Sequence, residues 1–223
     1  MTSDQFAQII IWVGLFLAVS GPVHESAHAY AAWRLGDGTA KLFGRISLDP
    51  VRHFDPLGGG LLIASVLLGL VSGGTGIGFG WAKPTPVNPY NLRGRHAESI
   101  VAAAGPVSNL ALAAVFAVGF RLLWAQGFLP ENTSVGNMVQ LVCLEGMELN
   151  IVLLIFNLIP IAPLDGSHVL LDFLSPRTAN EVRGFMNQYG MMLLIVVVLF
   201  ASRIISPLLV PMVNFLAGVP ILI

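Results

Sequence analysis

The sequence predicts an all-α polytopic membrane protein with about five to six transmembrane helices. Of its 223 residues, 55% are hydrophobic and only 10% are charged, and the mean hydropathy is +0.79. This composition excludes an ordinary soluble domain. The net charge of -1 and the lack of a basic run give no indication of nucleic-acid binding.

Five segments are apolar and long enough to cross a bilayer: about 6–34, 97–124, 146–172, 186–205 and 207–222. The first is not a signal peptide, because the opening Met-Thr-Ser-Asp lacks a positive charge and the apolar run continues into a charged motif. Prolines make the last segment the least regular. We expect one transmembrane domain over 1–223, with a core at about 6–175 and C-terminal helices at about 186–222.

A further apolar stretch, 57–80, is ambiguous. Glycines crowd its second half and disfavour a regular helix. Lys and Arg residues flank it on both sides, and the positive-inside rule places such flanks in the cytoplasm. Two cytoplasmic ends favour a re-entrant loop over a single crossing. The N-terminus is then external and the C-terminus cytoplasmic.

The motif His24-Glu25-Ser26-Ala27-His28 lies in a segment with no ionisable side chain from Phe6 to Val23. Residues four apart share a helix face, so both imidazoles can bind one Zn²⁺ while Glu25 acts on a water. The alternative is two core histidines and a glutamate bonded to helix neighbours, but such groups are expensive inside a membrane. His24 precedes Arg34 by about 15 Å of helix, which places the site nearer the cytoplasmic edge.

Asp165 is the best candidate for a third ligand, because a catalytic zinc usually takes three protein ligands and leaves one position for water. The single cysteine, Cys143, excludes a cysteine-based site and an internal disulfide. Pro160 and Pro163 disrupt the helix before Asp165, and irregular backbone at this depth indicates a buried or wet cavity. The alternative is that Asp165 only caps a helix at 167–174.

Three other polar residues are expected to be structural. His53 and Asp55 lie in a loop, and an Asp-Pro step is typical of a turn. His168 follows Asp165 by three residues, so it could support the site or act as a spare ligand. A structural role is favoured for all three.

The chain resembles the site-2 protease family of intramembrane metalloproteases (peptidase family M50), in its compact form without a PDZ or CBS domain. The resemblance runs in family order from about residue 20 to 170, and its most specific parts are the HExxH motif and Leu164-Asp165-Gly166. The other matching pieces are Leu35-Gly36-Asp37-Gly38-Thr39-Ala40, Gly44-Arg45-Ile46-Ser47-Leu48-Asp49-Pro50, His53-Phe54-Asp55-Pro56, Phe79 to Pro89, Ala104-Gly105-Pro106-Val107-Ser108-Asn109 and Phe156-Asn157-Leu158-Ile159-Pro160.

By this resemblance, one Zn²⁺ per chain would be bound by His24, His28 and Asp165, and Glu25 would be the general base and acid. Asn109 and Asn157 would be supporting residues that hold an unwound substrate backbone or a developing oxyanion. The segment around 76–90 resembles a short membrane-associated β-hairpin that receives the substrate as an added strand.

The expected function is therefore an intramembrane zinc endopeptidase that hydrolyses peptide bonds in or near transmembrane segments, as in regulated intramembrane proteolysis. We expect a multi-pass protein of a prokaryotic cell membrane whose partners are a transmembrane protein substrate and the lipid bilayer. Homo-oligomer formation stays open. The rival is a non-proteolytic zinc-binding membrane protein, either a transporter or an inactive substrate-binding relative. Glu25 favours the peptidase, because a binder needs ligands but no base.

Overall fold

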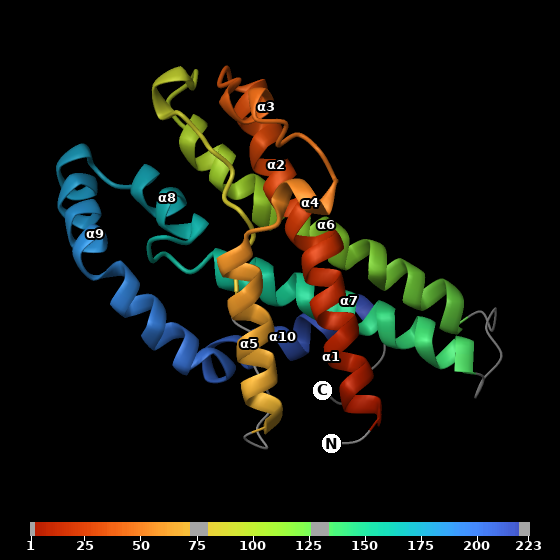
Figure 1. Ribbon diagram of the computed structural model, residues 1–223. Helices are drawn as coiled ribbons and strands as arrows, with labels where there is room; N and C mark the ends of the chain where they lie inside the picture. The colour runs from red at the N-terminus through yellow and green to blue at the C-terminus, as the bar shows by residue number, and fades with distance from the viewer. Residues whose placement is uncertain (1–2, 72–79, 126–133, 219–223) are drawn as a thin grey trace.

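The computed structural model describes residues 3–71, 80–125 and 134–218. All regular structure in these residues is helical (Figure 1). Four helical segments are long and apolar enough to cross a membrane: Ala7–Arg34, Ala97–Leu123, Val135–Asn157 and Pro176–Leu199. Two shorter apolar helices, Pro56–Leu68 and Arg203–Ala217, accompany them.

The N-terminal rod consists of α1 (Ser3–Leu15), a π-helical turn (Phe16–Ser20) and α2 (Gly21–Arg34). Pro22 has no N–H, so it cannot continue the regular hydrogen-bond pattern at this point. The chain widens instead, and the N–H of Gly21 donates to the carbonyl of Phe16. Such π turns often lie beside functional residues, and this one directly precedes the HExxH motif.

The connection after α2 carries two short helices, α3 (Thr39–Leu42) and α4 (Pro50–His53), before α5 (Pro56–Val71). Beyond 72–79 the chain returns to the beginning of α5. A Cβ atom on Gly58 would lie 2.2 Å from the carbonyl oxygen of Trp81, and the N–H of Lys83 donates to His53 O at 2.8 Å. The two ends of the 57–80 stretch therefore lie side by side.

The predicted β-hairpin at about 76–90 is wrong for the described residues, none of which forms a strand; residues 76–79 lie outside them. Residues 80–88 are irregular and lead into a short 3₁₀ turn, Pro89–Asn91. Pro84, Pro86 and Pro89 lack the N–H groups that a β ladder needs.

Helix α6 (Ala97–Ala125) packs against α2, α7 (Ser134–Asn157) and α8 (Asp165–Asp172). The span expected at 146–172 is wrong in position. The helix found there, α7, begins twelve residues earlier and ends at Asn157, before Pro160 and Pro163. Helices α9 (Pro176–Leu199) and α10 (Ala201–Ala217) complete the chain as described.

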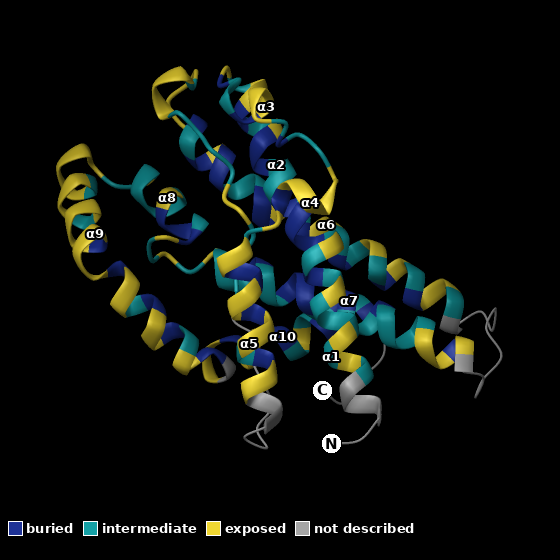
Figure 2. Cartoon of the chain, in the orientation of Figure 1, coloured by how far each residue is buried: buried dark blue, intermediate teal, exposed yellow. Residues whose placement is uncertain are grey.

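The largest buried cluster among the described residues lies between α6, α7 and α10. Gly146 brings α7 against the ring of Phe116, since a Cβ atom there would lie 2.7 Å from the ring. Figure 2 shows this packing as a buried centre, while the outer faces of α5 and α9 are largely exposed. The cluster consists of Ala113, Ala117, Phe120, Cys143, Met147, Ile151, Ala201, Ile205, Leu209, Val213 and Ala217.

Candidate metal centre

His24 and His28 lie one turn apart on α2 and are both buried. Their Nε2 atoms are 3.0 Å apart. Both rings pack onto Gly105 of α6, where a Cβ atom would lie 2.3 Å from Nε2 of His28 and 2.6 Å from Cε1 of His24. No side chain fits at Gly105 unless the imidazoles move.

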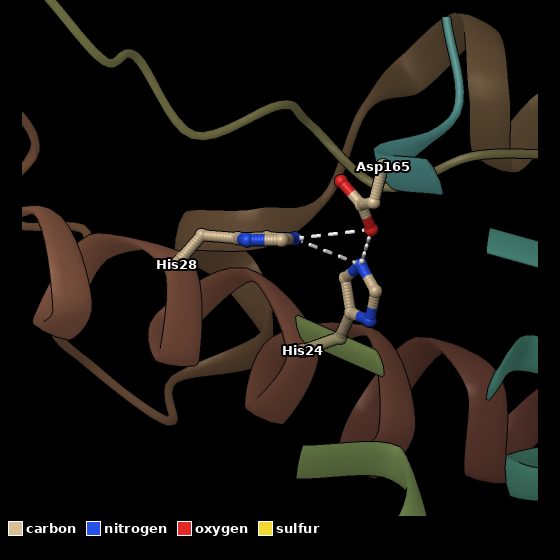
Figure 3. Close-up of side chains that lie close together, drawn as sticks. All are labelled: His24, His28 and Asp165. Atoms are coloured by element: carbon tan, nitrogen blue, oxygen red, sulfur yellow. Dashed lines mark hydrogen bonds and ion pairs between the residues drawn. The ribbon is translucent and has the colours of Figure 1, made fainter. Parts of the chain in front are cut away.

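Asp165 reaches the two histidines from the first turn of α8 (Figure 3). Gly166 allows this approach, because a Cβ atom there would lie 2.3 Å from the carbonyl oxygen of Leu158. The hydroxyl of Ser167 donates to Leu164 O at 2.7 Å and fixes the turn. The helix-cap alternative does not describe this arrangement, since Leu164 occupies the cap position and Asp165 is already helical.

The three side chains have the spacing of a metal site. Asp165 Oδ2 lies 3.3 Å from Nε2 of His24 and 3.4 Å from Nε2 of His28. Ligands at 2.0–2.1 Å from a tetrahedral zinc are about 3.3 Å from one another. Oδ2 is also a buried oxygen without a hydrogen-bond partner among the described residues. The residues present therefore fit a zinc ion.

Each imidazole is oriented by a hydrogen bond at its other nitrogen. Nδ1 of His24 lies 2.6 Å from Oδ1 of Asn109, and Nδ1 of His28 lies 2.7 Å from the carbonyl oxygen of Val101. Because a carbonyl oxygen can only accept, the His28 contact requires a proton on Nδ1, so in the neutral imidazole the Nε2 lone pair faces Asp165 and can bind a metal. Metal-binding histidines are commonly oriented in this way.

Glu25 lies beside the cluster and is held by Thr85. The Thr85 N–H donates to Oε2 of Glu25 at 2.7 Å, and the Thr85 hydroxyl donates to the Glu25 carbonyl at 2.9 Å. Pro84 and Pro86 have no N–H, so Thr85 is the sole backbone donor of this tripeptide. Sequence reasoning missed this contact, although the Pro-Thr-Pro pattern was the available signal.

Asp37 ties the Thr85 segment to the end of α2. It is fully buried and accepts from the N–H of Asn88 at 2.7 Å, the Thr39 hydroxyl at 2.6 Å and the Asn91 amide at 3.1 Å. Burial alone would raise the pKa of Asp37, but these hydrogen bonds outweigh it and lower the pKa below its ordinary value.

The other predicted residues do not join the cluster. Asn157 donates to Leu153 O at 3.0 Å within α7, and Asp55 caps α5 through the N–H groups of Leu57 and Gly58. His53 is buried, with Nε2 2.7 Å from Ser47 O. His168 pairs with Glu98 at 2.8 Å. These positions agree with the structural roles expected for His53, Asp55 and His168.

Comparison with known proteins gives the family. The profile of peptidase family M50 matches residues 131–199. The Bacillus subtilis protein named "Putative zinc metalloprotease YwhC" is 38% identical over 202 residues, which are 89% of this chain and 84% of the relative. "Putative zinc metalloprotease Rip2" of Mycolicibacterium smegmatis is 30% identical over 196 residues, 84% of this chain and 69% of its own length. No solved structure matches the chain.

The match to YwhC covers most of both chains at an identity that establishes common family membership. It agrees with the zinc-compatible cluster and with the four helices that are long and apolar enough to span a bilayer. The chain therefore belongs to the site-2 protease family, peptidase family M50, and is a zinc metalloprotease embedded in a membrane.

Proposed function

We propose that this chain is an intramembrane endopeptidase that cleaves membrane proteins within or beside their transmembrane segments. The observation that carries the proposal is the His24–His28–Asp165 cluster. Its two buried histidines, with Glu25 beside them, lie on a helical segment long enough to span the membrane, and the partly buried Asp165 joins them from α8. Ionisable groups at that depth are costly and indicate function. Their depth matches a substrate that is itself embedded in lipid.

One Zn²⁺ per chain would be held by Nε2 of His24, Nε2 of His28 and the carboxylate of Asp165. When bound there, the ion supplies a Lewis acid that polarises a carbonyl and lowers the pKa of a water toward ~7. The chain contributes the orientation of the two imidazoles and the burial that limits access of bulk water.

Glu25 would take the proton from the attacking water and deliver it to the leaving nitrogen. The Thr85 N–H holds Oε2 of Glu25, which leaves Oε1 to carry the proton. The Thr85 hydroxyl donates to the backbone carbonyl of Glu25. The carboxylate is therefore positioned before substrate arrives, and little reorganisation is needed at the moment of reaction.

A helical substrate must unwind before its carbonyls can react, because they are bonded within the helix. Asn157 precedes the irregular turn 158–164 that leads to Asp165 and is partly exposed. Its amide nitrogen donates to Leu153 O, so its amide oxygen would be the group that accepts from an unwound backbone. Asn109 is already bonded to His24, which suits a positioning role better than substrate contact.

The orientation in the membrane follows from the basic residues. With the 57–80 stretch re-entrant, the flanks that contain Arg34 and Arg95 are both cytoplasmic, and the N-terminus is external. The contact between Gly58 and Trp81, which brings the ends of this stretch together, supports the re-entrant form. The metal centre then lies nearer the cytoplasmic side.

The test is cleavage of single-span membrane substrates by purified protein in detergent, with wild type beside Glu25→Gln and zinc measured in both. We expect about one zinc per chain in each protein. Activity should fall at least about 100-fold in the variant, because a general base contributes 10²–10⁴-fold.

Equal cleavage by both proteins would remove Glu25 from the mechanism. Bound zinc without cleavage of any substrate would instead favour a non-proteolytic zinc-binding protein. Absence of zinc from both proteins would contradict the proposed metal centre.

A further inference from the structure

A chain of fully buried polar side chains continues from His24 away from the metal centre. Asn109 on α6, Asn150 on α7 and Ser20 at the end of the π turn all have no exposed surface. The Asn109 amide nitrogen donates to Oδ1 of Asn150 at 2.9 Å, and the Asn150 amide nitrogen donates to Ser20 Oγ at 3.0 Å. The same nitrogen donates to the carbonyl oxygen of Gly146 at 2.8 Å.

The Gly146 carbonyl gives this chain a fixed direction, because it can only accept a hydrogen bond. The Asn150 amide must therefore point its NH₂ group at Gly146, and its oxygen then faces Asn109. That oxygen requires the NH₂ group of Asn109, so the Asn109 oxygen faces His24. An oxygen at 2.6 Å from Nδ1 of His24 requires the proton on that nitrogen.

We propose that Asn150 is a positioning residue for the metal centre. Acting through Asn109, it holds His24 in the tautomer with the proton on Nδ1 and the Nε2 lone pair facing Asp165. The two metal-binding histidines are thus oriented by different means, His28 by a backbone carbonyl and His24 by a relay of two asparagines on two helices. The inference rests on the proposed function only in treating His24 as a zinc ligand.

Because the hydrogen-bond chain from Asn150 through Asn109 to His24 is buried, water cannot replace a lost partner and the direction of each hydrogen bond is important. A buried amide that loses its partner is costly, so Asn109 would turn to satisfy its NH₂ group if Asn150 could not accept from it. Turned, Asn109 would present NH₂ to Nδ1 of His24 and favour the proton on Nε2. Zinc binding would then have to displace that proton, which weakens the apparent affinity.

The experiment measures zinc affinity by chelator competition, and the His24 tautomer by ¹⁵N NMR of zinc-free protein. Asn150→Leu should lower zinc affinity by about 10- to 100-fold, the range expected when a metal ligand loses its hydrogen-bond acceptor, because a turned Asn109 no longer accepts from His24 Nδ1. It should also move the His24 proton from Nδ1 toward Nε2. Asn137→Leu, the same change at an exposed position of α7, is the matched control and should leave both unchanged.

The double variant Asn109→Asp/Asn150→Leu separates positioning from packing. A carboxylate can only accept, so it bonds to the His24 Nδ1–H whatever Asn150 provides, and zinc affinity should recover. Asn109→Asp alone should bind zinc more weakly than the double variant, because Oδ1 of Asn150 then faces a carboxylate. If Asn150→Leu does not fold, Asn109→Asp alone still tests the relay, because it should bind zinc more weakly than wild type while keeping the His24 proton on Nδ1.

The proposal is overturned if the His24 proton stays on Nδ1 in Asn150→Leu, or if the double variant binds zinc no better than either single variant. Failure of the proposed function looks different, because wild type itself would then bind no zinc. The tautomer in the zinc-free wild type and variants would still test the relay in that case.

Discussion

The candidate metal centre has two halves that are held in place by different kinds of interaction. The histidine half, residues 24–28 of α2, is fixed by buried hydrogen bonds to uncharged acceptors, the amide of Asn109 and the backbone carbonyl of Val101. The aspartate half, residues 158–172, is fixed at its far end to the start of α6. There His96 and Ser99 contact Asp172 at 2.7 and 2.6 Å, and His168 contacts Glu98 at 2.8 Å.

This difference predicts different sensitivities. Buried hydrogen bonds between neutral groups are little affected by salt, whereas exposed ion pairs are screened and titrate. The histidine half should therefore depend on shape and hydrogen-bond direction. The contacts that hold the aspartate half should weaken at high salt and at low pH.

Gly105→Ala should give the largest effect. The new methyl group would overlap both imidazoles of the histidine half, so zinc affinity should fall by more than about 100-fold. Gly119→Ala on the same helix is the control, since its Cβ atom would make only an ordinary contact of 3.6 Å with Cys143. Zinc titration of both variants tests this, and equal affinities would contradict the tight packing at Gly105.

Thr85→Pro should reduce turnover by about 10-fold or more, since it removes the N–H that orients Glu25. Zinc affinity should hardly change, because Thr85 touches no ligand. Thr85→Ala keeps the N–H and loses only the hydroxyl, so its effect on kcat should be clearly smaller. If the alanine variant were as slow as the proline variant, the hydroxyl and not the N–H would be the important group.

Asp37→Asn should destabilise the protein by about 2 kcal/mol, since it removes a buried charged acceptor of several hydrogen bonds. The pKa of Asp37 in the folded state lies below its ordinary value of 3.8, so its contribution is present above that pH and is lost as the pH falls further. The difference in thermal stability between wild type and variant should therefore shrink below about pH 4. A constant difference down to lower pH would contradict a charged Asp37.

Asp172→Asn should have the smallest effect, a change of less than about threefold in zinc affinity, because exposed ion pairs contribute little. Hydrogen bonds from Ser99 and then His96 lower the pKa of Asp172, so this contact also weakens as the pH falls below 3.8. The effect of the substitution should diminish at high salt. A larger effect at high salt than at low salt would show that the ion pair is not what holds the aspartate half.

The residues of the metal centre could be found from the sequence because each belongs to a motif with a chemical requirement. The spacing of His24 and His28 places them on one helix face, and the prolines before Asp165 indicate an irregular turn at membrane depth. The structure brings all three together. Their role as zinc ligands remains a prediction that metal titration can test.

Other features could not be predicted because they depend on tertiary contacts. The helix containing Asn150 begins at Ser134, and no local signal placed Asn150 opposite Asn109 and Ser20. The hairpin prediction failed because Thr85 and its neighbours direct their N–H groups to Glu25, His53 and Asp37, which are distant in sequence. The family resemblance predicted a hairpin, but residues 80–88 are irregular because their backbone N–H groups bond to these distant residues.

The hydrogen bond from His28 to the Val101 carbonyl has a consequence for how this protein tolerates mutation. Backbone atoms are unchanged by most substitutions, so the orientation of His28 is protected against nearly every single replacement at Val101. The orientation of His24 depends on side chains and has no such protection. Random mutagenesis should therefore yield more loss-of-function changes among the hydrogen-bond partners of His24 than at Val101, the partner of His28.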